Sequence, residues 1–332
     1  MACLYFLTII KPVFIAAIMM NPESSTGPVK FCRLKSALFF LPLIVCMPVS
    51  VAADNPEHAK RETATIVPRP DRVVIVIEEN KSYEQINGNQ NAPYINLLAG
   101  NGALFTQSFG VTHPSQPNYL ALFSGSTHGI TSDDCPLPLS GANLASELIK
   151  KGLSFGTYSE SMPAAGYAEC YAESRLYARK HNPAVNWQGQ NVPPEVNMPL
   201  VAFPRDFTKL PTISIVIPNQ ENDMHNGWNQ DDAIKLGDSW LRNTLDAYVQ
   251  WTRTHNSLLL LTWDEDDSSS NNHIPTILVG PMIKPGRYDM RIDHYSVLRT
   301  LEEMYGLAFL GNTVDTQPIQ NIWVTEKEPD SQ

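Results

Sequence analysis

The chain has 332 residues, a formal net charge of −10 and 43% hydrophobic residues. This length and composition suit one large α/β domain with a sizeable core. The acidic balance argues against nucleic acid or an anionic membrane surface as a standing partner, and part of the acid is available to neutralise bound cations.

The first 53 residues resemble a secretory leader rather than part of the folded domain. Basic residues precede an apolar run at 37–45, and small residues at 51–53 offer a cleavage site before Asp54. The apolar run is too short and too proline-interrupted to be a membrane span. We therefore predict a cleaved leader over 1–53, no stable membrane span afterwards, and a secreted or periplasmic protein. A second apolar stretch at 4–20 leaves the true start methionine open.

After a polar, proline-bearing linker at 54–70, strand-like and helix-like segments alternate through a predicted catalytic domain at 71–316. The predicted strands cover 72–77, 103–109, 154–159, 212–217, 257–263 and 276–279. The predicted helices cover 92–101, 116–124, 142–151, 233–254 and 295–305. Residues 160–210, rich in Pro, Asn and aromatics, are expected to form a long excursion over the active face, and 317–332 a C-terminal tail. This alternation predicts an α/β fold, a three-layer α/β/α arrangement with a mainly parallel central sheet.

Two of the apolar runs end abruptly in acidic residues. The run at 73–77 leads into Glu-Glu-Asn at 78–80, and the run at 258–263 leads into Asp-Glu-Asp-Asp at 264–267. Unbroken apolar runs predict strands buried on both faces of a parallel sheet, and ligands bind beyond the carboxyl ends of such strands. Several carboxylates placed there need a counter-charge, most often a metal ion. The alternative is a solvated turn after each strand.

Two further polar clusters, at 112–118 and 219–225, are expected at the same edge of the sheet. Ser115 is the central hydroxyl, because Pro117 places it just before a helix. The N-terminus of that helix offers free N–H groups and partial positive charge to a phosphate. Taken alone, Ser115 is more typical of a helix cap than of a nucleophile. A metal held by neighbouring carboxylates would instead make it a nucleophile.

Five cysteines are present, and three of them fall in the predicted leader. The remaining two, Cys135 and Cys170, favour one disulfide in an oxidising compartment. Two free thiols or a cysteine nucleophile are less favoured, since neither residue lies beside a His or Lys that would lower its pKa.

The nucleophile region resembles that of the alkaline phosphatase-like superfamily, with Thr-His-Pro-Ser-Gln-Pro-Asn at 112–118 and His-Gly-Ile at 128–130. More closely, the stretch 72–310 is similar to the phosphoesterase family of acid phosphatases and phospholipases C. The motifs that carry the likeness are Glu-Asn-Lys-Ser-Tyr at 79–83, the segment 218–225, Thr-Trp-Asp-Glu-Asp-Asp at 262–267 and His-Tyr-Ser-Val-Leu-Arg-Thr at 294–300. This resemblance implies an alkaline phosphatase-like fold.

The resemblance also implies roles for individual residues. Ser115 maps onto the nucleophile, which also touches the metal, and His225 onto a proton donor or oxyanion partner. His113 is placed either to contact the phosphate or to pack under the loop, and Asp266 could substitute in the acidic pair. The implied metal ligands are Glu79, Asn80, Ser115, Asp223, Asp264 and Glu265, and the implied catalytic residues are Ser115, His225 and His113.

The other histidines carry weaker expectations. His128 matches a structural turn, His294 is expected to anchor the last helix, and His273 is a weak site candidate. His181, like His58 and His255, shows no functional signal.

We therefore expect a secreted phosphoesterase that needs at least one divalent metal ion. An acid phosphatase that cleaves phosphate monoesters through a phosphoserine is favoured. A phospholipase C or other phosphodiesterase would use the same core, and a secreted binding protein without turnover is a distant alternative. The expected partner is a small phosphate ester or a phospholipid head group, while the metal, the pH optimum and the oligomeric state stay open.

Overall fold

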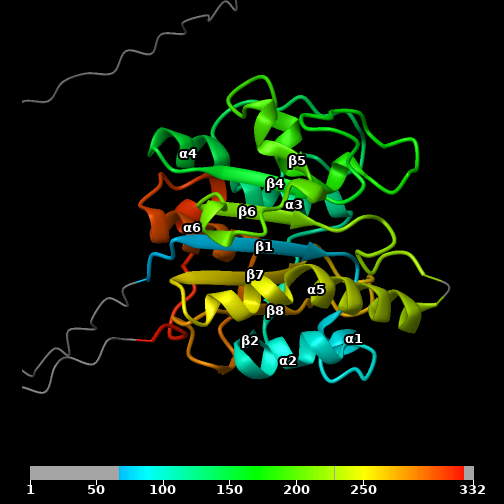
Figure 1. Cartoon of the computed structure of the whole chain (residues 1–332), viewed down its shortest axis with the longest axis vertical. Helices are drawn as coiled ribbons and strands as arrows, with labels where there is room; N and C mark the ends of the chain where they lie inside the picture. Colours follow the sequence, from blue (N-terminus) through cyan, green and yellow to red (C-terminus); the bar gives the residue numbers. More distant parts are fainter. Residues whose placement is uncertain (1–66, 228, 325–332) are drawn as a thin grey trace, which may run out of the picture. The chain divides into compact units, whose positions relative to one another are not determined.

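The computed structural model describes residues 67–227 and 229–324; the predicted leader at 1–53 lies outside them. Eight strands form one sheet in the order β5-β4-β6-β1-β7-β8-β2-β9, and β8 runs antiparallel to both of its neighbours. The other strand pairs of this sheet are parallel. The predicted α/β class with a mainly parallel central sheet is therefore confirmed (Figure 1).

The strands of the main sheet are β1 (Arg72–Glu78), β2 (Ala103–Phe105), β4 (Phe155–Ser159), β5 (Asn197–Pro199), β6 (Ile213–Ile217), β7 (Ser257–Trp263), β8 (Thr276–Val279) and β9 (Gly286–Tyr288). A second, two-stranded sheet joins β3 (Ser108–Phe109) and β10 (Ile292–Asp293). The α-helices are α1 (Tyr83–Ile86), α2 (Pro93–Asn101), α3 (Ser115–Ser124), α4 (Leu144–Lys150), α5 (Gln230–Thr252) and α6 (His294–Tyr305). The 3₁₀ helices are η1 (Arg179–His181), η2 (Pro183–Trp187), η3 (Pro194–Val196), η4 (Leu200–Ala202), η5 (Phe207–Lys209) and η6 (Gly311–Asp315).

The central strand β1 divides the core into two halves, because successive side chains of a strand point to opposite faces. Val73 and Ile75 pack with residues of α3, α4 and α6, whereas Val74 and Val76 pack with residues of α1, α2 and α5. All four side chains are fully buried, and each burial contributes roughly 1.5–3 kcal/mol. Helices therefore cover both faces, and Figure 1 shows α5 in front of the strands.

Capping residues fix where the long helices begin and end. Asn229 accepts a hydrogen bond from the backbone N–H of Asp232 at the start of α5, and Asp293 does the same for Ser296 at the start of α6. The helix α3 ends at Gly125, which has a φ of 71°. A side chain at this position would approach the carbonyl oxygen of Leu310 to 1.9 Å, so only glycine fits.

The structure departs from the sequence prediction where elements are short. The strand predicted over 103–109 is two strands, because Ser108 leaves the main sheet and pairs with Ile292. Its hydroxyl is hydrogen-bonded to Thr276 at 2.7 Å. The helix α1 and the strands β5, β9 and β10 were not predicted, since two to four residues carry no readable periodicity.

The packed structure continues beyond residue 316, where the tail was predicted to begin. Ile319, Ile322 and Trp323 are buried in the core. The carbonyl of Ile322 accepts a hydrogen bond from the backbone N–H of Lys284. These apolar side chains hold the segment against the domain at least as far as Trp323.

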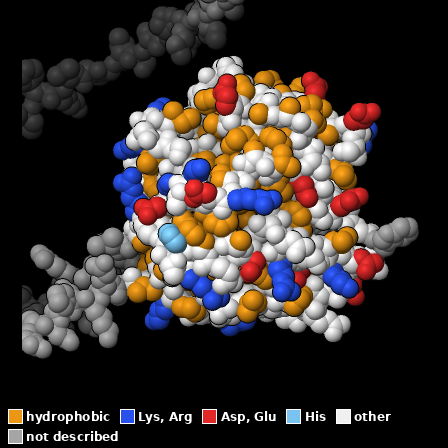
Figure 2. Space-filling view, viewed as in Figure 1, with side chains coloured by type: hydrophobic (Ala, Val, Ile, Leu, Met, Phe, Trp, Pro, Cys, Tyr) orange, Lys and Arg blue, Asp and Glu red, His pale blue; other side chains and the backbone are white. Residues whose placement is uncertain are grey.

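The predicted disulfide between Cys135 and Cys170 is present. None of the helices within 67–227 and 229–324 has the length and apolar character needed to cross a membrane. On the face shown in Figure 2, acidic and basic side chains are spread out and hydrophobic side chains gather toward the centre.

Candidate active site

The predicted nucleophile lies among acidic side chains that follow two neighbouring strands. The hydroxyl of Ser115 donates to Glu79 Oε2 at 3.0 Å and lies 3.3 Å from Glu265 Oε1. Glu79 follows β1, and Glu265 follows β7, which pairs with β1 over its whole length. Ser115 is 2% exposed and begins α3. The structure therefore brings Ser115, Glu79 and Glu265 together at the carboxyl edge of the sheet, as expected.

Asn80 and Asp264 complete this side of the cluster. The backbone N–H of Asn80 donates to Asp264 Oδ1 at 3.1 Å, and its side-chain amide donates to Glu265 Oε1 at 2.8 Å. Asn80 has a φ of 48°, an uncommon conformation that asparagine tolerates better than most residues. This turn aims the amide side chain back into the cluster.

Burial and mutual repulsion raise the pKa of several of these carboxyl groups. Burial, followed by the charge of Glu79, raises the pKa of Asp264 well above its ordinary range and that of Glu265 to about 8. The same causes raise the pKa of Asp223 to about 6, against the opposing charge of His181. A cation among these groups would relieve the repulsion, because an opposite charge favours the ionised carboxylate.

The donor atoms present fit an oxygen-liganded divalent cation. Asn80 Oδ1 and Asp264 Oδ2 are buried and have no hydrogen-bond partner among the residues that the structure describes. Buried polar atoms are nearly always paired, and amide and carboxylate oxygens are ligands of hard cations. Within the described residues, no three His, Cys, Asp or Glu side chains form a complete metal site by themselves. The fitting set therefore combines carboxylates with the Asn80 amide and the Ser115 hydroxyl.

Glu79 is held from two sides. Its Oε2 accepts the hydroxyl of Ser115, while its Oε1 accepts the hydroxyl of Tyr119 and lies 3.1 Å from His181 Nε2. Burial alone would raise the pKa of Glu79, but the charge and hydrogen bond of His181 outweigh it and lower the pKa. The imidazole of His181 also lies 3.7 Å from Asp223 Oδ2 and stacks on the ring of Tyr119. His181 thus links the two predicted ligands Glu79 and Asp223.

His113 lies at the more open side of the cluster. Its Nδ1 is 2.8 Å from Glu265 Oε2 and its Nε2 is 3.2 Å from Asp266 Oδ1, and its side chain is 39% exposed. Asp266 itself accepts backbone N–H groups of the loop that follows it, including those of Ser268 and Ser270. This occupation favours Asp264 and Glu265 over Asp266 as the acidic pair.

Within the described residues, no contact brings the side chain of His225 into the cluster. Its backbone N–H donates to Asp223 Oδ1 at 3.0 Å, but its imidazole is exposed and pairs with Asn226 at 2.9 Å. A catalytic role for this imidazole stays a prediction from the family resemblance.

Three other histidines have structural surroundings. His128 contacts the hydroxyl of Ser124, and His273 stacks between Tyr83 and Phe109. The Nε2 of the buried His294 lies 2.7 Å from the carbonyl oxygen of Asp264, so it ties the start of α6 to the acidic pair.

Sequence reasoning missed two basic residues of η1, Lys180 and His181. The ammonium of Lys180 lies 3.5 Å from Ser115 Oγ and 2.8 Å from Asp133 Oδ2. The available signal was positional: His181 is the single histidine within 160–210, the segment expected to cover the active face.

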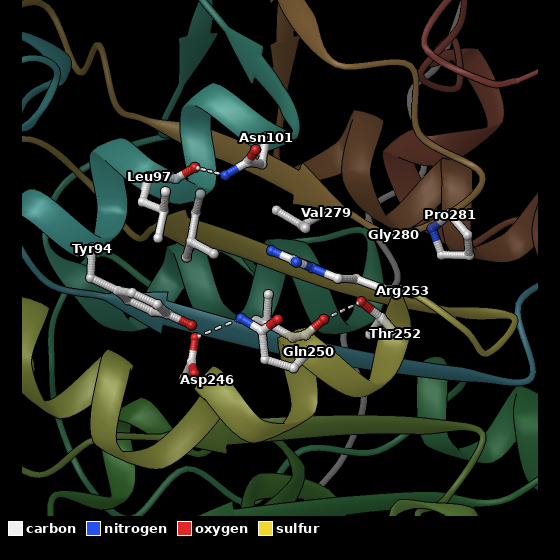
Figure 3. Close-up of a pocket in the computed structure, with 12 residues that line it drawn as sticks. Tyr94, Leu97, Asn101, Asp246, Gln250, Thr252, Arg253, Val279, Gly280 and Pro281 are labelled. Atoms are coloured by element: carbon white, nitrogen blue, oxygen red, sulfur yellow. Dashed lines mark hydrogen bonds between the residues drawn. The ribbon is translucent and has the colours of Figure 1, made fainter.

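A separate pocket of about 310 Å³ lies between α2, α5 and the end of β8 (Figure 3). Figure 3 shows the side chains of Tyr94 and Asp246 pointing toward one another across it. Val279 in its wall pairs with Leu259, near the start of β7 and at the opposite end of that strand from Asp264. The pocket is therefore not part of the Ser115 cluster.

Comparison with known proteins identifies the family of the chain. The model of the phosphoesterase family matches residues 88–308, more than half of the chain. The chain belongs to the phosphoesterase family. It is therefore a hydrolase acting on phosphoric ester bonds, as the sequence motifs predicted.

Two relatives and one solved structure illustrate the likeness. The chain is 49% identical over 264 residues to a phosphatidylinositol-3-phosphatase of Mycobacterium tuberculosis, covering 78% of this chain and 85% of that protein. It is 34% identical over 256 residues to a phosphate-repressible acid phosphatase of Penicillium chrysogenum, covering 73% of this chain but only 60% of that protein. The solved structure of a Vibrio parahaemolyticus protein in the alkaline phosphatase superfamily matches with a TM-score of 0.50 at 13% identity. The match covers 77% of this chain and 72% of that one. This last likeness concerns the fold alone.

Proposed function

We propose that the protein is a secreted or periplasmic phosphatase that cleaves phosphate monoesters with a divalent cation and a phosphoserine at Ser115. The observation that carries the proposal is the contact of the Ser115 hydroxyl with Glu79 and Glu265, beside the unpaired oxygens of Asn80 and Asp264. The two relatives described above bear the names of phosphatases, which supports a monoester substrate.

A bound cation would supply charge neutralisation and Lewis-acid polarisation at this cluster, held by Asn80, Asp264, Glu265, Glu79 and Ser115. Asp223, 3.7 Å from His181, is the candidate for a further ligand.

The chain's own residues would carry out the transfer in two steps. Glu265 Oε1, 3.3 Å away, accepts the proton of Ser115, and Oγ attacks phosphorus in line as the bond to the leaving alcohol breaks. The departing alkoxide takes a proton, for which the partly exposed His113 is the candidate donor. Water then attacks the phosphoserine and gives one proton to His113. Inorganic phosphate leaves, and Oγ of Ser115 recovers its proton from the carboxyl group that took it.

The test is the hydrolysis of p-nitrophenyl phosphate and of bis(p-nitrophenyl) phosphate by the protein, before and after chelation of divalent ions. We expect monoester turnover that chelation abolishes and that Ser115→Ala reduces by at least about 10³-fold. Ser140→Ala, at an exposed serine, is the matched control and should leave turnover unchanged. Full activity in Ser115→Ala would refute the phosphoserine, and a preference for the bis-ester would move the assignment to a phosphodiesterase or phospholipase C.

The proposed export has its own test. N-terminal sequencing of the protein recovered from the periplasm or medium should begin at Asp54, after the predicted cleavage site. Recovery of the chain only inside the cell with its leader intact would contradict this part of the proposal.

A further inference from the structure

A lysine and an aspartate beside Ser115 belong to none of the motifs that identify the family. Lys180 Nζ lies 3.5 Å from Ser115 Oγ and 2.8 Å from Asp133 Oδ2. The side chain of Lys180 is 15% exposed and that of Asp133 is 31% exposed. A separation of 3.5 Å is long for a hydrogen bond, yet the oxygens of a phosphoryl group joined to Oγ would come within reach of this ammonium.

The helix N-terminus at Ser115 lacks one of the donors that a phosphate would use there. The backbone N–H of Gln116 donates to Asp133 Oδ1 at 2.9 Å, and Pro117 has no N–H to give. Of the N–H groups expected to be free at this helix N-terminus, that of Gln116 is therefore already paired. The ammonium of Lys180, 3.5 Å from Oγ, places a side-chain positive charge beside this terminus.

Two further contacts hold this lysine in position. The disulfide joins Cys135, two residues after Asp133, to Cys170, whose carbonyl accepts the backbone N–H of Arg179 at 2.9 Å. The guanidinium of Arg179 is also hydrogen-bonded to the carbonyl of Ala168 at 2.6 Å. The disulfide therefore fixes both the loop that carries Asp133 and the turn that carries Lys180.

We propose that Lys180 selects doubly charged phosphate monoesters over singly charged diesters, with Asp133 as its positioning residue. The proposal rests on the proposed phosphatase function and deepens it. A lysine ammonium is charged at neutral pH and acts on phosphate as a compact point charge, so its attraction grows with the charge of the group that it faces. A monoester dianion offers this ammonium an unesterified, charged oxygen that a diester replaces with an ester oxygen.

The decisive experiment compares two substrates in four variants. We measure kcat/KM for p-nitrophenyl phosphate and for bis(p-nitrophenyl) phosphate in Lys180→Met, Lys180→Arg, Asp133→Asn and the control Lys209→Met. Lys209 is 75% exposed and pairs with Asp206, so its replacement removes a lysine and an ion pair away from Ser115. Lys180→Met should lower the monoester value about 10²-fold, as expected for the loss of one group that stabilises charge in the transition state, and the diester value only a few-fold.

The other variants separate charge from position. Lys180→Arg keeps the charge and should recover part of the monoester preference. Asp133→Asn should shift the preference in the same direction as Lys180→Met by a smaller factor. Calorimetric titration with inorganic phosphate gives a readout without turnover, and its Kd should rise at least about 10-fold in Lys180→Met but not in Lys209→Met.

Two results for Lys180→Met would overturn the assignment. One is an equal loss of kcat/KM on the monoester and the diester. The other is an unchanged ratio of the two kcat/KM values together with an unchanged Kd for inorganic phosphate. If Lys180→Met fails to fold, judged by its melting temperature, Lys180→Gln and Asp133→Asn carry the same comparison. If diester turnover is below detection, competitive inhibition by inorganic phosphate and by diethyl phosphate replaces it. Wild-type protein that hydrolyses neither ester would refute the proposed function alone, and the phosphate titration would still decide the role of Lys180.

Discussion

Glu302 in α6 makes the stability of the fold depend on pH in a direction opposite to that of most acidic residues. Its side chain is fully buried, with Oε1 accepting the backbone N–H of Leu310 at 2.9 Å and Oε2 accepting the hydroxyl of Thr313 at 2.6 Å. Burial raises the pKa of Glu302 from 4.5 to about 7, against the opposing effect of these two hydrogen bonds.

The sign follows from where the proton binds more tightly. Because the folded pKa lies above the unfolded value, the folded state holds the proton over a pH range in which the unfolded chain has lost it. The contribution to stability is therefore complete below about pH 4.5 and is lost as the pH rises through about 7. A shift of this size corresponds to a change in the free energy of unfolding on the order of 3 kcal/mol.

The assay is urea unfolding of the wild-type protein and of Glu302→Gln between pH 4.5 and pH 8. Glutamine stays neutral, so the stability of the variant relative to wild type should rise with pH by up to roughly 3 kcal/mol. Glu303→Gln is the matched control, since Glu303 is 28% exposed and pairs with Arg299 in the same helix. A difference between Glu302→Gln and wild type that stays constant across this pH range would refute the reasoning.

Two further predictions concern the crosslink and the cation. The disulfide spans a sequence separation of 35, so replacing Cys135 and Cys170 with Ala should cost roughly 4 kcal/mol, or about 8–16 °C in Tm. A double variant that melts within about 2 °C of wild type in a thermal scan would contradict this estimate. A divalent cation at about 100 times its Kd should stabilise the protein by roughly 2.7 kcal/mol, and Asp264→Asn should largely remove that effect. A rise in Tm that is the same in Asp264→Asn and wild type would place the cation elsewhere.

The parts of the site that could be predicted from the sequence are those attached to strands with a strong pattern. Between its first and last residues β1 is fully apolar, and β7 is apolar except for Thr262, so their depth in the sheet follows from the sequence. Glu79 and Asp264 come directly after these strands, and their meeting at one edge is a consequence of parallel pairing. Ser115 could be placed because Pro117 marks the first turn of its helix.

The basic side of the site could not be predicted, because its residues come from a segment without periodicity. The path of 160–210 is set by 3₁₀ turns, by the buried guanidinium of Arg179 and by the disulfide, none of which has a pattern in the local sequence. His181 reaches Glu79 only because this segment folds back over α3, where its ring stacks on Tyr119. Long-range contacts of this kind set the position of His181, whereas the strands set the positions of the proposed metal ligands.

The hydrogen bond between Gln116 and Asp133 shows why local sequence alone misassigns the electrostatics around Ser115, the proposed nucleophile. A helix that begins at Ser115 suggests backbone donors for a phosphate, but a loop 17 residues further along the chain returns to the first turn and takes one of them. One oxygen of the Asp133 carboxylate accepts the backbone N–H of Gln116, and the other accepts the ammonium of Lys180. The carboxylate therefore occupies a backbone donor and at the same time holds a lysine beside Ser115. Asp133→Asn keeps an oxygen for the amide of Gln116 while removing the charge that attracts Lys180. Asp133→Asn therefore perturbs Lys180 and leaves the helix terminus unchanged, so it is more informative than Asp133→Ala.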